Sequence, residues 1–145
     1  MPSRDTEAKP SLGGAVERLG VMPGQAVFRR EGEYWTIVYQ DTVLRLRDSR
    51  GLRYIAHLLR HPGTRFAARD LMQAVQLENP TPDTRHPIPF PDERARLAVT
   101  KRIKAAVKNV DAHHAALAYH LRTTVKTGAY CVYLPDPERP IVWRS

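Results

Sequence analysis

Residues 42–72, TVLRLRDSRGLRYIAHLLRHPGTRFAARDLM, are the most informative part of this sequence for predicting its structure. Leu44 and Leu46 alternate with arginines, and this alternation predicts a half-buried strand. Asp48 and Ser49 follow at once, and both are residue types that cap the start of a helix. The stretch therefore predicts a strand that passes directly into a helix.

Two short amphipathic helices are expected after this strand. The first, over 49–62, places apolar residues at helical spacing, and Pro62-Gly63 ends it. Those apolar residues are Leu52, Ile55, Ala56 and Leu59. A brief strand is expected at 64–66, and a second helix over 68–77 should turn Leu71, Met72 and Val75 inward. Two helices joined by a tight turn indicate a helix-turn-helix type of arrangement.

The residues before this stretch predict an antiparallel β-meander over 26–47. Residues 34–39 are β-branched and aromatic, which suits a pleated sheet, and turns are expected at 31–33 and 40–41. Residues 1–22 are rich in Ser, Pro, Gly and charge without clear periodicity, so we expect a flexible N-terminal arm. The remaining chain, 23–145, is expected to form one domain.

A long proline-rich loop and a basic helix follow. Residues 79–91, NPTPDTRHPIPFP, cannot continue a helix. The helix expected over 92–110 places apolar side chains on one arc and basic side chains on the opposite arc, with Leu97 lying among the bases. The apolar arc holds Val99, Ile103, Ala106, Val107 and Val110, and the basic arc holds Arg94, Lys101, Lys104 and Lys108.

The C-terminal part predicts a short helix and a hairpin. Asp111 is a candidate cap for a helix over 112–121. A β-hairpin is expected over 122–134, with its turn at Lys126-Thr127-Gly128, where glycine allows a positive φ. Residues 141–143 are expected to fold back as an edge strand or packing anchor.

The charge of the chain is concentrated in one region. The 145 residues carry a net charge of +8 with a pI near 10.1. Residues 93–134 hold eight bases against two acids, which is six of those eight net charges. Such concentration indicates a binding face for an acidic partner. The single Cys argues against a disulfide framework, and the chain has neither a signal-peptide pattern nor an apolar run long enough to cross a bilayer. We therefore expect a cytoplasmic, nucleoid-associated protein without membrane contact.

The order of these elements resembles a winged helix-turn-helix DNA-binding domain, and more narrowly the effector domain of OmpR-type response regulators and of antibiotic regulatory proteins. Three stretches carry the likeness: residues 42–72, the helix RLAVTKRIKAAVKNV (96–110) and the wing-like TTVKTGAYCVY (123–133). The likeness covers roughly residues 26–134 as a pattern rather than an identity. It implies an α+β fold with three to four helices and a C-terminal wing.

The resemblance also implies which residues meet DNA. The helix over 92–110 would lie in the major groove, and a hairpin tip would contact the minor groove or the backbone. In that family, the loop between the second and third helices can contact RNA polymerase, so 79–91 implies RNA polymerase or another protein as a partner. The expected DNA contacts are Arg94, Thr100, Lys101, Lys104, Lys108, Arg122, Thr124, Lys126, Arg65 and Arg69.

Three functions remain open from the sequence: a bacterial transcription regulator that binds double-stranded DNA, a winged-helix adaptor that binds proteins, and a nucleoid-type protein with little sequence preference. A homodimer is compatible with the first, because DNA readers often double their half-sites. No P-loop, dinucleotide-binding, nucleophile-elbow or zinc-protease motif is present, so we expect no catalysis and no cofactor. His113, His114, His120 and Cys131 do not suit a metal site, because adjacent His residues on a helix point different ways.

Overall fold

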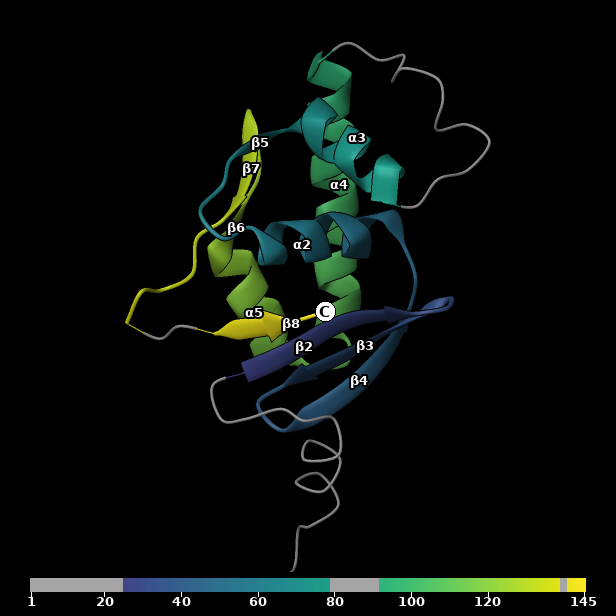
Figure 1. Ribbon diagram of the computed structural model, residues 1–145, viewed down its shortest axis with the longest axis vertical. Coiled ribbons are helices and arrows are strands. Elements are labelled where there is room, and N and C mark those ends of the chain that lie inside the picture. The colour runs from purple at the N-terminus through teal and green to yellow at the C-terminus, as the bar shows by residue number, and fades with distance from the viewer. Residues whose placement is uncertain (1–24, 79–91, 139–140) are drawn as a thin grey trace, which may run out of the picture. The chain divides into compact units, whose positions relative to one another are not determined.

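The structure is a computed structural model that describes residues 25–78, 92–138 and 141–145 (Figure 1). The expected α+β class is confirmed, since the described residues form four helices and two sheets. None of these four helices has the length and apolar character that would let it cross a membrane. The sequence indicates one domain over 23–145, and the described residues group into two compact units, one of 25–47 with 141–145 and one of 48–78 with 92–138. The expected arm at 1–22 and loop at 79–91 lie outside the described residues.

The first unit is a four-stranded sheet in the order β4-β3-β2-β8. Its strands are β2 (Gln25–Glu31), β3 (Tyr34–Tyr39), β4 (Thr42–Arg47) and β8 (Val142–Arg144). The first three pair antiparallel through two-residue turns, whereas β8 pairs parallel with β2 at the edge of the sheet. The predicted meander and the predicted edge strand are both confirmed.

Backbone conformation and aromatic packing fix this sheet. Gln40 and Asp41 have φ of 50° and 64°, the left-handed values that a type I′ hairpin turn demands. Trp143 on β8 stacks on Tyr39 at a centroid distance of 6.1 Å and meets Phe28 edge-on at 5.9 Å. The C-terminal segment is therefore held by aromatic contacts as well as by its backbone pairing.

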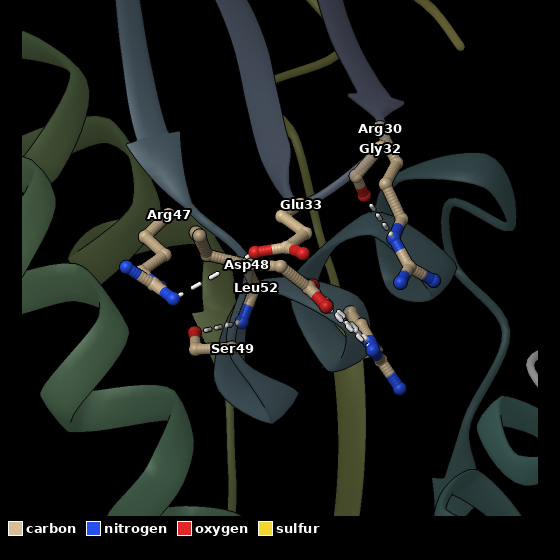
Figure 2. A network of polar contacts seen from close by, with 8 residues as sticks. Arg30, Gly32, Glu33, Arg47, Asp48, Ser49 and Leu52 are labelled. Atoms are coloured by element: carbon tan, nitrogen blue, oxygen red, sulfur yellow. Dashed lines mark hydrogen bonds and ion pairs between the residues drawn. The ribbon is translucent and has the colours of Figure 1, made fainter.

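The second unit opens with α2 (Arg50–Arg60), and its start is capped as the sequence predicted. Ser49 Oγ accepts a hydrogen bond from the Leu52 amide at 3.3 Å (Figure 2). Asp48 accepts hydrogen bonds from Arg53 Nε at 3.1 and 3.2 Å, which ties the residue before the cap to the first turn of the helix. The helix ends at Arg60, two residues before the predicted end, and Gly63 continues the turn with φ of 78°. All four apolar residues predicted to face inward are buried.

A small antiparallel sheet follows the order β5-β7-β6. It consists of β5 (Phe66–Ala67), β6 (Val125–Lys126) and β7 (Tyr130–Tyr133). Phe66 pairs with Cys131, and Val125 pairs with Tyr133. The predicted hairpin is confirmed with shorter strands, and Gly128 in its turn has φ of 135°. The brief strand predicted at 64–66 begins two residues later.

Helix α4 (Asp92–Asp111) is the element around which the second unit is packed. It contacts α2, α3 (Ala68–Glu78) and α5 (Ala115–Thr124), and Figure 1 shows it crossing behind α2 and α3. Its approach to α2 is very close at Gly51, where an added Cβ would lie 2.1 Å from the Arg102 carbonyl oxygen and 2.8 Å from Ala106 Cβ. Only glycine permits this contact between the two backbones. The residues that α4 buries are Ala95, Val99, Ile103, Ala106, Val107 and Val110, which confirms the predicted apolar arc.

The last helix differs from its prediction. It spans 115–124 rather than 112–121, and its cap is His114, whose Nδ1 accepts a hydrogen bond from the Leu117 amide at 3.3 Å. Asp111 belongs to the last turn of α4, so the prediction that it caps this helix is wrong. Helix α4 includes the buried Val110 and ends at Asp111. Thr123 and Thr124 consequently lie in α5 rather than in a strand.

An ionic cluster joins the ends of α2 and α3. Glu78 accepts two hydrogen bonds of 2.8 Å from Arg60 Nη2, and its Oε2 lies 2.8 Å from His57 Nδ1. The His61 ring packs on His57 with ring centroids 4.6 Å apart. Burial lowers the His61 pKa, and His57 and Arg60 lower it further, while the Glu78 carboxylate acts in the opposite direction. Arg60 therefore serves the packing of two helices, a role that the sequence did not reveal.

Replacing Gly51 by alanine should destabilise the protein. In the interior of a helix, alanine is more favourable than glycine by about 1 kcal/mol. The same substitution at a position with free space around it would therefore stabilise the protein. At Gly51 the added methyl group meets backbone, and we expect a loss of roughly 1–3 kcal/mol in the free energy of unfolding. Urea unfolding followed by circular dichroism measures it, and a neutral or stabilising change would contradict the close approach of α2 and α4.

The thiol of Cys131 should react slowly in the folded protein. The side chain is 1% exposed, and burial raises its pKa to about 11, so little thiolate forms near pH 8. We expect slow reaction with a chromogenic disulfide reagent in buffer and fast, stoichiometric reaction in guanidinium chloride. Equally fast labelling in both conditions would contradict the burial of β7.

Candidate nucleic-acid interface

The outward face of α4 carries the candidate site. Its buried residues recur at helical spacing, so the opposite arc is left to solvent. Arg94, Lys101, Lys104 and Lys108 are all exposed on that arc, and we call these four residues the basic strip. The first and the last of them are 14 positions apart, or about 21 Å along the helix axis. The structure thus brings together four of the ten residues predicted to bind DNA.

The basic strip is not neutralised by the described part of the chain. None of its four cations forms an ion pair with a described carboxylate, although other cations near it do. Arg96, on the flank of α4, pairs with Glu93 at 3.4 Å. Neighbouring cations repel one another unless an anion lies close to them. Because no described carboxylate does so here, a bound ligand or salt ions must supply the negative charge.

Ion pairs place two further predicted residues at the ends of α4. Arg69 on α3 lies 3.4 Å from Asp92 in the first turn of α4, and Arg122 on α5 lies 3.8 Å from Asp111 in its last turn. Both arginines are therefore near the helix, one at each end. Exposed pairs of this kind contribute little to stability, so a phosphate can displace the carboxylate at small cost.

The hairpin carries a single predicted base at its tip. Lys126 on β6 is exposed and forms no ion pair with another described residue. The hairpin is held to α5 by His120, whose Nε2 lies 3.0 Å from the Tyr133 hydroxyl and whose ring meets the Tyr133 ring edge-on at 5.9 Å. Burial lowers the His120 pKa, so this ring is neutral at pH 7.

The three remaining predicted residues differ in their suitability. Thr100 is half-exposed at the edge of the basic strip, and Arg65 is exposed just before β5. Thr124 is only 7% exposed, and its hydroxyl donates a hydrogen bond to the His120 carbonyl within α5. The prediction that Thr124 contacts phosphate is therefore wrong, because the residue lies in the helix rather than in the hairpin.

Two exposed apolar side chains were not predicted as site residues. Leu97 is 64% exposed, one helical turn from Arg94 and one from Lys101, so it lies within the basic strip. Its position among the bases was visible in the periodicity. Tyr119 is 66% exposed on α5, one turn before Arg122. Its exposure was hard to predict, because the expected bounds of that helix were shifted by three residues.

A metal site is not found among the described residues. No three His, Cys, Asp or Glu side chains within residues 25–78, 92–138 and 141–145 come together as a metal ion requires. Comparison of the chain with protein families, with curated proteins and with solved structures gives no match. The site must therefore be interpreted from its own charge and geometry.

Proposed function

We propose that this protein binds double-stranded DNA through the basic strip of α4. The observation that carries the proposal is that Arg94, Lys101, Lys104 and Lys108 are exposed on one face without an ion pair to a described carboxylate. A duplex presents closely spaced phosphates along its axis, and lysine or arginine that neutralises them releases condensed ions. A straight row of cations about 21 Å long suits such a ligand better than it suits a compact anion.

The major groove is the favoured place for α4. This groove is about 12 Å wide and admits a helix, so the long side chains of the basic strip can reach phosphates that line it. Arg69 and Arg122, at the two ends of α4, would extend the contact along the backbone by exchanging their carboxylate partners for phosphates. Lys126 at the hairpin would then add a contact outside the major groove.

The arrangement of the second unit supports a winged-helix assignment. The chain passes from α2 through β5 to α3 and α4, and later through the hairpin β6–β7, with β7 in the centre of the small sheet. Helix α5 intervenes between α4 and the hairpin, which the OmpR-type pattern does not require. By this resemblance we propose a bacterial transcription regulator as the cellular role.

A protein adaptor is the second candidate, and the outer face of α5 favours it. This face exposes Ala115, Ala116 and the large ring of Tyr119, and Arg122 follows one turn later. Exposed tyrosines are frequent where proteins bind one another. Capture of an acidic protein together with a failure to shift duplex DNA would favour the adaptor, and binding of random duplex without enrichment of any motif would favour a nucleoid-type protein.

Binding to duplex DNA should weaken steeply with salt. For four phosphates neutralised by the basic strip, the logarithm of the association constant should fall with the logarithm of the salt concentration with a slope of about −3.6. Fluorescence anisotropy with a labelled 30-base-pair duplex between about 50 and 200 mM NaCl measures the slope. Absent or salt-independent binding would refute the proposal.

Reversing charge on the basic strip should abolish binding while leaving the fold intact. We expect the double variant Lys101→Glu/Lys104→Glu to lose affinity at least 100-fold at 50 mM salt, since two attractions become repulsions (roughly 1.4 kcal/mol is tenfold). The matched control is Arg45→Glu/Arg47→Glu, two exposed arginines of β4 whose reversal changes the net charge equally. Circular dichroism verifies folding of both variants. An equal loss in the control would show that net charge, and not the basic strip, controls binding.

A further inference from the structure

Leu97 is the one large apolar side chain that α4 exposes. The other large aliphatic residues of this helix, Val99, Ile103, Val107 and Val110, are buried against its neighbours. Single exposed leucines are common on protein surfaces, so exposure alone means little. What distinguishes Leu97 is its place: Arg94 precedes it by one turn and Lys101 follows it by one turn, and both cations are exposed on the same face.

This placement puts an apolar group between two phosphate-binding cations. Along the helix axis, Leu97 lies about 4.5 Å from Arg94 and about 6 Å from Lys101. Arginine and lysine side chains are long and flexible, so they can bend aside to the phosphates of the groove, while the shorter Leu97 on the same face meets the base edges on the floor of the groove. It is also the sixth residue of α4, in the N-terminal part of the helix, which in helix-turn-helix proteins contacts the bases.

The floor of the major groove offers one apolar group, the C5-methyl of thymine. We propose that Leu97 is a specificity-determining residue that packs on thymine methyl groups, while Arg94 and Lys101 hold the flanking phosphates. The inference rests on the proposed DNA binding and deepens it. The other proposed contacts are to phosphates, which carry no sequence information, so this contact would supply the sequence preference of the interface.

Two neighbours of Leu97 bear on this assignment. Glu93, one turn before it, would repel phosphate, but its carboxylate is paired with Arg96 at 3.4 Å. Thr100, one turn after it, is half-exposed and carries a methyl group that can join the same contact. A membrane surface is a poorer match for this face, because helices that lie on lipid present a broad apolar face and α4 exposes a single large apolar residue.

The test compares thymine with uracil, which pairs identically but lacks the methyl group. Bound duplexes are first selected from a random pool with the full chain, and the selected site is synthesised once with thymidine and once with deoxyuridine. Wild-type protein should bind the thymine duplex about fourfold more tightly, the factor expected for burying one methyl-sized group. The variant Leu97→Ala should bind both duplexes equally. The matched control Leu77→Ala, which alters a leucine of α3 that is 67% exposed, should retain the fourfold preference.

Each result has a distinct meaning. Duplex binding without preference for thymine, a preference that survives Leu97→Ala, or a pool from which no sequence is enriched would overturn the role of Leu97 and leave DNA binding standing. No duplex binding at 50 mM salt would overturn the proposed function and this inference with it. In that case, Leu97-dependent binding to phosphatidylglycerol vesicles would assign the same residues to an anionic membrane surface.

Discussion

Helices α2 and α4 meet backbone to backbone at Gly51, and this contact determines how the second unit packs. Gly51 lies directly against the Arg102 carbonyl and Ala106, so it fixes both the distance between the two helices and the rotation of α4 about its own axis. With that rotation set, Val99, Ile103 and Val110 are buried, and the opposite arc must face outward. The exposure of Arg94, Lys101, Lys104 and Lys108 is thus a consequence of packing on the other side of the helix.

The electrostatic character of the surface follows from where the carboxylates lie. Those of α4 are confined to its ends, at Asp92, Glu93 and Asp111, and each is engaged by an arginine. All charged side chains in the middle of the helix are basic. An exposed helix in an ordinary protein mixes both signs, because i,i+4 pairs of opposite charge are stabilising. Here that local stabilisation is absent from the middle of α4, which is reasonable for a surface that meets an anion.

Much of the fold could be predicted from the sequence, and the reasons are local. Alternation at Leu44 and Leu46, the cap at Ser49 and the periodicity of α4 each depend on residues a few positions apart. What could not be predicted depends on contacts between distant residues. The His57–Glu78 pair spans 21 positions, and the parallel pairing of β8 joins the two ends of the described chain. Helix α5 starts at Ala115, after a cap by His114, which is not one of the usual capping residue types, and the mistaken role of Thr124 followed from that one boundary.

The carboxylates of Asp92 and Asp111 compete with any anionic ligand for Arg69 and Arg122. Each of them occupies a place beside an arginine that a phosphate would need, so the chain supplies its own internal competitors at the two extremities of α4. A ligand that reaches Arg69 or Arg122 must displace a carboxylate that is already paired there, whereas along the centre of the helix it meets cations that no described carboxylate neutralises. Most of the binding free energy should therefore come from the centre of the helix. The ion pairs at its two ends reduce what Arg69 and Arg122 can contribute.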